Sequence, residues 1–153
     1  KWKDIPAICI GKGTAKMVQK LWGKVDYIAQ NSYGDELAKE IIKTYPPSNI
    51  LFLKAKVVLS DIVNILKSNN FNIIEKVVYE TNCNKIDFQP KKGDIFIFTS
   101  PSTIKCFLNS FNWDKNYKAV AIGTRTASYF KGEIVTSEIQ TIENCIKIAK
   151  NLL

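Results

Sequence analysis

Short apolar runs rich in β-branched residues alternate with longer amphipathic stretches along almost the whole chain. Runs of this length predict buried strands, and the stretches between them predict helices. Strands that alternate with helices are typical of βαβ units and a parallel sheet. The expected strands are 7–10, 25–28, 50–53, 73–79, 94–98, 119–122 and 133–135, and the expected helices lie near 14–22, 34–44, 58–69, 102–111, 125–130 and 140–152.

The last expected helix has a regular apolar pattern. Apolar residues recur there at steps of three and four, which predicts one apolar helix face. This face comprises Ile139, Ile142, Ile146, Ala149 and Leu153.

Ser100-Pro101 predicts the start of helix 102–111. Serine is a favoured N-cap residue, and proline fits the first helical position. Residues 99–103 then lie at the carboxyl end of a strand. Open parallel sheets bind their ligands at that edge.

One polar, turn-rich segment interrupts the alternation after Tyr79-Glu80-Thr81. Its composition is typical of a linker. We therefore expect a first α/β lobe over 1–81, a linker over 82–93 and a second α/β lobe over 94–153.

An internal repeat supports two lobes of one architecture. Ala7-Ile-Cys-Ile-Gly-Lys-Gly-Thr-Ala15 and Ala119-Val-Ala-Ile-Gly-Thr-Arg-Thr-Ala127 match in kind at nearly every position. Each copy is a strand that runs into Gly-x-x-Thr-Ala and a helix. A second strand and a serine, Ser32 or Ser137, follow in both copies.

The repeated turns, Gly11-Lys12-Gly13-Thr14 and Gly123-Thr124-Arg125-Thr126, are suited to anions. Glycine permits a tight turn and a close approach of the backbone. Free N–H groups and the helix dipole at a helix start attract carboxylates or phosphates, and the threonines can cap or donate there. The alternative is that both are merely tight connections between a strand and a helix.

A net charge of +8 indicates an affinity for anions, but its sign alone does not separate nucleic acid from a small polycarboxylate. The lysines are scattered, with no run of five and no aromatic-basic RNA motif, so no nucleic-acid partner is expected. The apolar runs are far shorter than the roughly 20 residues of a membrane helix, so no membrane partner is expected either.

Four cysteines, Cys9, Cys83, Cys106 and Cys145, lie far apart and form no Cys-x-x-Cys pair. This spacing disfavours a metal or redox pair, so we expect four reduced core thiols in a cytoplasmic protein. The chain contains no histidine, which excludes Ser-His-Asp and Cys-His catalysis and the common zinc sites with histidine ligands. No metal site is expected.

Three segments in order carry a family resemblance: Val78-Tyr79-Glu80-Thr81, Phe98-Thr99-Ser100-Pro101-Ser102, and Lys118-Ala-Val-Ala-Ile-Gly123-x-x-Thr126-Ala127. The chain resembles the uroporphyrinogen-III synthase family over essentially its whole length. The resemblance implies two flavodoxin-like lobes, each a parallel β-sheet flanked by helices, joined by a linker. In that family each lobe also carries a Thr-Ser-x-x segment, which the first lobe lacks here. We therefore expect a strand and a helix of each lobe to be missing ahead of Lys1.

The resemblance also implies an activity. Members of the family close the linear tetrapyrrole hydroxymethylbilane with loss of water and invert its last pyrrole ring, without a cofactor. This substrate is a tetrapyrrole polycarboxylate, which fits the positive net charge. The implied protein is a cytoplasmic monomer that binds this small molecule.

Individual roles follow from the same resemblance. Tyr79 matches the family tyrosine proposed to assist departure of the substrate hydroxyl, work suited to a weak acid. An ordinary tyrosine at a strand end is the alternative, and for Lys118 the alternative is a solvated charge. The positions matched to substrate binding are Gly11, Lys12, Gly13, Thr14, Ser100, Ser102, Thr103, Lys118, Gly123, Thr124, Arg125 and Thr126.

Two departures mark a divergent member. No proline follows Gly123, and Leu53-Lys54-Ala55 stands where the family often has Leu-Arg-Gly. A competing interpretation is a non-enzymatic flavodoxin-like module that binds an anionic small ligand at the same strand edge. A basic nucleic-acid-binding protein is a third.

Overall fold

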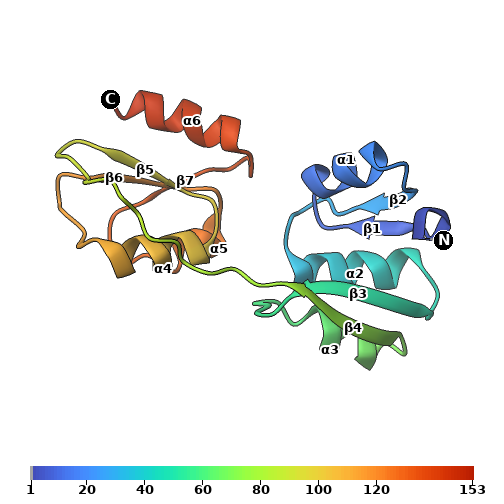
Figure 1. The fold of residues 1–153 in the computed structure, drawn as a ribbon. Coiled ribbons are helices and arrows are strands. Elements are labelled where there is room, and N and C mark those ends of the chain that lie inside the picture. The colour runs from blue at the N-terminus through green and yellow to red at the C-terminus, as the bar shows by residue number, and fades with distance from the viewer. Residues whose placement is uncertain (1) are drawn as a thin grey trace. The chain divides into compact units, whose positions relative to one another are not determined.

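The computed structural model describes residues 2–153 and consists of two compact units, Lys1–Glu80 and Thr81–Leu153 (Figure 1). Every paired strand is parallel, and helices flank the sheets. The predicted parallel α/β fold is confirmed. In the described part of the chain, no helix has the length and hydropathy needed to cross a membrane.

Unit 1 holds two separate two-stranded sheets, β1–β2 and β3–β4. Helix α1 packs on the first pair, while α2 and α3 pack against each other and α3 against β4. The elements are a 3-10 turn at Trp2–Asp4, β1 (Ala7–Cys9), α1 (Lys12–Lys20), β2 (Val25–Ile28), α2 (Gly34–Thr44), β3 (Asn49–Ala55), α3 (Ile62–Ser68) and β4 (Asn72–Tyr79).

The core of unit 1 is mostly aliphatic. Helix α2 buries Leu37, Ala38 and Ile41, which share one face at helical spacing. Helix α3 adds Ile62 and Leu66 to the same cluster. Partly buried side chains of β3 pack against this cluster from alternate positions of the strand.

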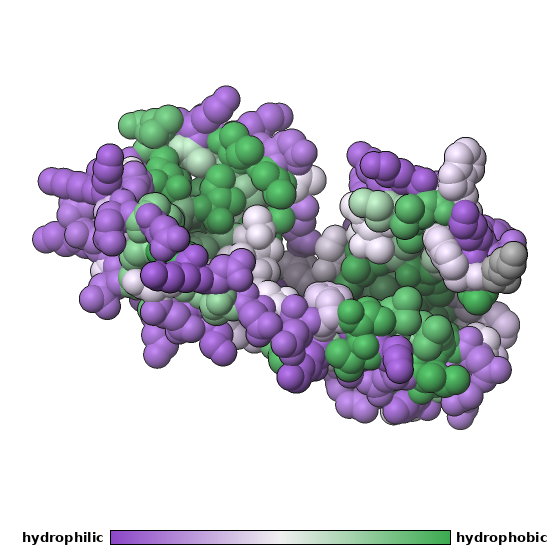
Figure 2. Space-filling model, viewed as in Figure 1, coloured by the Kyte–Doolittle hydropathy of each residue, from purple (hydrophilic) through white to green (hydrophobic). Residues whose placement is uncertain are grey.

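The opposite face of the β3–β4 sheet is apolar and exposed. Leu51 and Leu53 of β3 are 58% and 57% exposed, and Ile74, the strand partner of Leu51, is exposed as well. Figure 2 shows hydrophobic side chains at the surface of both units. Parallel sheets normally carry cover on both faces, so this face of unit 1 lacks the expected cover.

Unit 2 contains one three-stranded parallel sheet in the order β5-β6-β7. An aromatic cluster fills its core, in which Phe96 and Phe107 have ring centroids 4.5 Å apart and Trp113 and Phe130 have theirs 4.7 Å apart. The elements are β5 (Ile95–Phe98), α4 (Pro101–Ser110), β6 (Lys118–Ala121), α5 (Thr124–Ala127), β7 (Val135–Thr136) and α6 (Ile142–Asn151).

Helix α6 packs with a different face from the expected one. Cys145 is fully buried, and Ile148, Ala149 and Leu152 are half-buried on the same side. The predicted apolar face meets the sheet only near Ala149, because its other four residues are exposed. The small Cys145 side chain lets α6 lie close to β5 and β6, which it contacts. The exposed stripe comprises Ile139, Ile142, Ile146 and Leu153.

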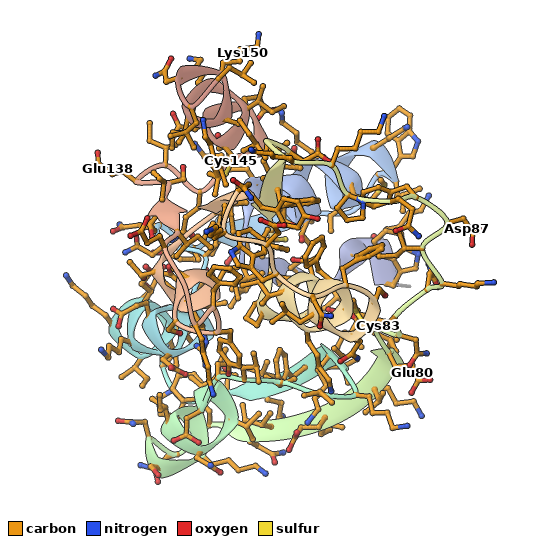
Figure 3. All side chains as sticks on the ribbon, turned by 90° about the vertical axis from the view of Figure 1, so that its left-hand side faces the viewer. Glu80, Cys83, Asp87, Glu138, Cys145 and Lys150 are labelled. Atoms are coloured by element: carbon orange, nitrogen blue, oxygen red, sulfur yellow. A yellow bond between two sulfur atoms is a disulfide. The ribbon has the colours of Figure 1, made fainter. Side chains whose placement is uncertain are left out.

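The expectation of four reduced core thiols is wrong for two of them. Cys83 and Cys106 form a disulfide between the segment that precedes β5 and helix α4. Figure 3 shows Cys83 beside this helix, outside the core. The segment folds back onto α4, which brings together two cysteines that are distant in sequence. Cys9 and Cys145 are buried free thiols, as predicted.

Candidate functional site

Three connections of unit 2 lie along one edge of its sheet, because its strands are parallel and each connection follows the carboxyl end of a strand. Ile122 N–H donates to the Phe98 carbonyl at 3.0 Å, and Ser137 N–H donates to the Ala121 carbonyl at 2.8 Å. These bonds place the carboxyl ends of β5, β6 and β7 side by side. The edge therefore unites the Ser100 and Gly123 turns that the repeat and the resemblance singled out.

The Ser100 turn is a capping box. Thr103 N–H donates to Ser100 Oγ at 3.3 Å, and Ser100 N–H donates to Thr103 Oγ1 at 3.2 Å. Ser100 Oγ also lies 2.8 Å from Ser102 Oγ. Ser100 and Thr103 are thus engaged in starting α4, and Ser102 is the hydroxyl of this group that forms no part of the cap.

The Gly123 turn starts α5 without a side-chain cap. Thr126 is only 5% exposed, so its side chain belongs to the interior of unit 2. Thr124 is exposed and Arg125 is half-buried. The side chains of Thr124 and Arg125 thus lie on the outside of this turn, while Thr126 supports the turn from inside.

The Gly11 turn has the same backbone shape as the Ser100 turn, with φ −163° and ψ 161° at both N-cap residues. Gly11 has no side chain that could cap α1. The first backbone N–H groups of the helix must therefore find their hydrogen-bond acceptors elsewhere. Lys12, Gly13 and Thr14 are exposed around the start of the helix. This turn presents backbone N–H groups, a hydroxyl and an ammonium group on one exposed surface, which is a favourable setting for a carboxylate.

Of the two expected reasons for glycine, a tight turn is not what requires it at Gly11. Gly11 has an extended backbone that any residue adopts. A Cβ added to Gly11 would meet Ser32 Oγ at an ordinary 3.5 Å, and one added to Gly13 would have no described atom within 4 Å apart from its chain neighbours. Neither the backbone nor the packing of the chain requires glycine here. Close approach of an outside group is the remaining physical reason.

Two serines lie at these edges that were not among the predicted site residues. Ser32 follows β2 and places its hydroxyl next to Gly11. Ser137 follows β7, is 3% exposed, donates to the Ile139 carbonyl at 2.6 Å and accepts from Asn144 Nδ2 at 2.8 Å. The repeated serine after the second strand was the signal for both. Ser137 holds its turn together, and Ser32 remains open to a ligand.

Tyr79 is the last residue of β4 and is 60% exposed. Its carbonyl accepts a 2.8 Å hydrogen bond from Lys56 N–H, which fixes the end of the strand. Asp61 N–H donates to Asp35 Oδ1 at 2.6 Å, which joins the starts of α2 and α3, the helices that follow β2 and β3. The carboxyl ends of both sheets of unit 1 therefore face the same side, with Tyr79 and the Gly11 turn on it.

Lys118 does not join the other predicted residues of unit 2. It is the first residue of β6, at the amino end of the strand, whereas Ser100 and Gly123 follow carboxyl ends. Its Nζ donates to the Leu152 carbonyl near the end of α6. The ammonium group thus supports the end of a helix, where a cation is favourable.

Cys9 lies two residues before Gly11 and is buried. Burial raises the pKa of the Cys9 thiol, so this sulfur stays protonated and is a poor nucleophile. Among residues 2–153, no three His, Cys, Asp or Glu side chains lie close enough together to hold a metal ion. The polar groups at the Gly11, Ser100 and Gly123 turns are hydroxyls, backbone N–H groups and cations, which suit anionic ligands. The starts of α2 and α3, on the same side of unit 1, carry the carboxylates of Asp35 and Asp61.

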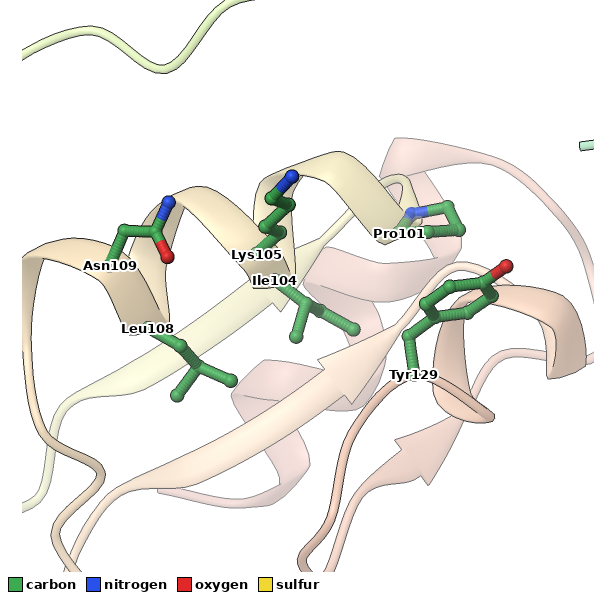
Figure 4. Close-up of a pocket in the computed structure, with 6 residues that line it drawn as sticks. All are labelled: Pro101, Ile104, Lys105, Leu108, Asn109 and Tyr129. Atoms are coloured by element: carbon green, nitrogen blue, oxygen red, sulfur yellow. The ribbon is translucent and has the colours of Figure 1, made fainter. Parts of the chain in front are cut away.

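A shallow pocket of about 280 Å³ runs along α4 next to this edge in unit 2 (Figure 4). It begins at Pro101, in the Ser100 turn, and has an apolar wall with polar groups at the rim. The wall and rim residues are Pro101, Ile104, Lys105, Leu108, Asn109 and Tyr129.

Comparisons with known proteins agree with one another. The family model described as "Uroporphyrinogen-III synthase HemD" matches residues 1–147. The "Porphyrin biosynthesis protein HemD" of Ruminiclostridium josui is 30% identical over 150 residues, which cover 90% of this chain. The chain spans only 30% of that relative's length.

A solved structure is similar over nearly the whole chain. It is the crystal structure of uroporphyrinogen-III synthetase from Helicobacter pylori 26695, with 28% sequence identity and a TM-score of 0.81. The match covers 99% of this chain and 71% of the Helicobacter chain. The chain belongs to the uroporphyrinogen-III synthase family.

Proposed function

We propose that the protein is a uroporphyrinogen-III synthase, a lyase of haem biosynthesis that converts hydroxymethylbilane to uroporphyrinogen III with loss of water and inversion of ring D. The observation that carries the proposal is the family match together with two repeated turns, at Gly11 and Gly123, that start helices without a side-chain cap. Such turns suit carboxylates, and the proposed substrate carries many of them.

The proposed binding mode uses hydroxyls, N–H groups and cations rather than a single strong site. Lys12 and Thr14 stand at the start of α1, and Ser32 lies next to Gly11. In unit 2, the proposed hydroxyls are Ser102 in the Ser100 turn and Thr124 in the Gly123 turn. For Lys118 a direct role has the least support, because its ammonium group lies at the other end of β6.

The proposed chemistry needs one proton transfer at each end of the reaction. The substrate hydroxyl leaves as water after it accepts a proton, and a ring carbon loses a proton after the closing bond forms. Tyr79 is our candidate donor of the first proton, and its phenolate can take up the second. No net proton is consumed. Holding the flexible substrate with its ends together supplies much of the rate by orientation, and no cofactor is part of the proposal.

Tyr79→Phe should then lower turnover by about 10- to 100-fold without abolishing it, because water can replace a weak acid. Tyr117→Phe removes a hydroxyl next to the amino end of β6, away from the proposed proton path and binding turns, and is the matched control. Equal turnover in Tyr79→Phe and wild type would remove Tyr79 from the mechanism.

The test of the activity is an isomer assay. Freshly generated hydroxymethylbilane is supplied to the full-length gene product, the products are oxidised, and type I and type III uroporphyrin are separated by chromatography. The proposal predicts mainly type III. Type I alone, at the rate of a control without protein, would contradict it and favour a binding module on the same scaffold.

We further propose that the protein works in the cytoplasm as a monomer on a small-molecule polycarboxylate, with neither nucleic acid nor membrane as a partner. The scattered lysines and the family's small-molecule substrate support this. Sedimentation of the full-length protein should give the monomer mass, and added duplex DNA should not change its sedimentation at physiological salt.

Finally, we propose that each unit is completed by a further strand and helix from outside residues 1–153. The uncovered apolar face with Leu51, Leu53 and Ile74 supports this in unit 1. In the full-length gene product, Leu51→Ala should then cost about 2–5 kcal/mol of unfolding free energy, as at a buried site. Val57→Ala, at an exposed position outside the sheet, is the control. An equally small loss for both variants would contradict the proposal.

A further inference from the structure

The connecting segment between β4 and β5 is held to unit 2 by two independent attachments. The first is the Cys83–Cys106 disulfide, which joins the early part of the segment to α4. The second is Phe88, whose ring lies 5.3 Å from that of Phe111 and 6.5 Å from that of Phe96. The second attachment does not depend on the first, because its contacts are aromatic.

Among residues 84–87, which lie between these two attachments, only Ile86 is half-buried, and the other three side chains are exposed. Lys85 and Asp87 form an ion pair at 4.0 Å with side chains 92% and 85% exposed, and such a pair contributes almost nothing to order. Beyond Phe88 the chain stays on unit 2, since Lys91 N–H donates to Asp94 Oδ2 at 2.7 Å. Opening the disulfide would therefore release residues 83–87 and leave the remainder in place.

The same bond sets the length of the connection between the units. Glu80 is the last residue of unit 1, and the carbonyl of the preceding Tyr79 accepts a 2.8 Å hydrogen bond from Lys56 N–H. With the disulfide closed, residues 81–82 connect that point to the attachment at Cys83. With the disulfide open, the connection extends over residues 81–87 to Phe88. The reach of a flexible chain grows with the square root of its length, so the connection gains about 1.9-fold in reach.

We propose that Cys83–Cys106 is a reversible thiol–disulfide exchange site that a dithiol reductant opens to lengthen the connection between the two units. Cys83 is exposed and Cys106 is half-buried, so the reductant reaches Cys83 first. This site lies outside the proposed proton path and binding turns. It also reconciles a disulfide with the proposed cytoplasmic location, where disulfides are mostly transient or redox-sensing.

The exchange is a balanced two-electron step. A thiolate of the reductant attacks Cys83 Sγ, the S–S bond breaks, and Cys106 leaves as a thiolate that takes a proton from solvent. The second thiol of the reductant then attacks the mixed disulfide and releases Cys83 as a thiol. The reductant ends as a disulfide, and the protein has gained two electrons and two protons.

The first experiment counts thiols in the full-length protein by alkylation under denaturing conditions and mass spectrometry of the peptides with Cys9, Cys83, Cys106 and Cys145. Without reductant, Cys83 and Cys106 should resist alkylation, whereas Cys9 and Cys145 should react. After incubation of the folded protein with dithiothreitol or a thioredoxin-type dithiol protein, all four should react. Removal of the reductant in air should restore the first pattern.

The second experiment measures trypsin cleavage after Lys85 in both forms. Reduction should raise the cleavage rate there by about tenfold, because the released stretch samples open conformations more often. Cleavage after Lys43 in unit 1, measured in the same digest, should not change. Cys83→Ser should cleave at the reduced rate with or without reductant. This variant keeps the fold because the Cys83 side chain is exposed.

Two outcomes would overturn the proposal. Alkylation of Cys83 and Cys106 without reductant would mean that the disulfide does not form in the protein. Equal cleavage after Lys85 in oxidised, reduced and Cys83→Ser protein would mean that the bond does not restrain the segment. Both readouts are independent of catalytic activity, so they stand whatever the isomer assay shows.

Discussion

The backbone N–H of Asp61 donates a 2.6 Å hydrogen bond to Oδ1 of Asp35, joining the first turns of α3 and α2. The negative charge of the Asp35 carboxylate strengthens this bond and interacts favourably with the positive end of the α3 helix dipole. Asp35→Ala should therefore lower the unfolding free energy by about 1–2 kcal/mol, measured by urea titration. Glu36→Ala removes the same charge from the same turn but loses only an exposed ion pair with Lys39, so its loss should stay below about 0.5 kcal/mol. Equal losses would contradict the role given to Asp35.

The Ser100 turn allows stability and binding to be separated. Ser100→Ala removes the α4 cap and should cost about 1 kcal/mol of unfolding free energy. Ser102→Ala leaves the cap intact, so its melting temperature should match wild type while its KM for hydroxymethylbilane rises. A normal KM in Ser102→Ala would remove this hydroxyl from the proposed binding site.

Gly11→Ala tests whether this glycine is needed for the stability of the fold or for the binding of a ligand. The structure accommodates the added Cβ, so stability should equal or slightly exceed that of wild type, since alanine reduces the entropy of the unfolded chain. The methyl group should obstruct a carboxylate at the start of α1 and lower kcat/KM. Gly23→Ala is the contrasting control, because its Cβ would lie 2.6 Å from a Trp2 ring carbon and 2.7 Å from Val18 Cγ1. Gly23→Ala should therefore lower the free energy of unfolding, in contrast to Gly11→Ala.

Tyr45 should show a strongly altered titration. Its hydroxyl donates a 2.6 Å hydrogen bond to Asp26 Oδ2, and this bond, helped by burial and the Asp26 charge, raises the pKa of Tyr45 to about 12. The folded protein thus holds this proton more tightly than the unfolded chain, where tyrosine titrates near about 10. The interaction stabilises the fold fully below about pH 10 and loses that effect as the pH rises to about 12.

The difference in tyrosinate absorbance between wild type and Tyr45→Phe isolates this titration. Asp26→Asn should bring the pKa of Tyr45 back toward its ordinary range and flatten the alkaline loss of stability. A Tyr45 that ionises near pH 10 in wild type would show that the bond to Asp26 is not maintained in solution.

Local patterns predicted the elements well where a single cause decides them. The strand Val25–Ile28 and the helix Gly34–Thr44 have the predicted bounds, and Ser100-Pro101 begins α4 with the expected cap. The carboxyl-edge turns followed from parallel strands alone. The position of Lys118 could have been predicted as well, since it lies at the amino end of its strand and so belongs to the opposite edge from Gly123.

The errors arose where tertiary contacts decide. Steps of three and four along α6 do not tell which of two neighbouring stripes meets the sheet. In the structure the stripe with the small Cys145 side chain is buried, and Ile142 and Ile146 are exposed. The pairing of Cys83 with Cys106 depends on the path of an irregular segment, which has no periodicity to read. Neither the exposure of Thr14 nor the burial of its repeat counterpart Thr126 follows from two nearly identical turn sequences.

The unequal cores of the two units have a spectroscopic consequence. Trp113 is the one tryptophan in the sequence of unit 2 and lies among phenylalanine rings, so its fluorescence reports on the packing of that unit. Trp2 and Trp22 belong to unit 1, and Trp22 is 82% exposed, so their emission should lie further to the red. In a Trp2→Phe, Trp22→Phe variant, the melting of the aromatic cluster can be followed by emission wavelength while far-ultraviolet circular dichroism records the whole chain. A difference between the melting temperatures from the two signals would show that the two units unfold independently in the intact chain.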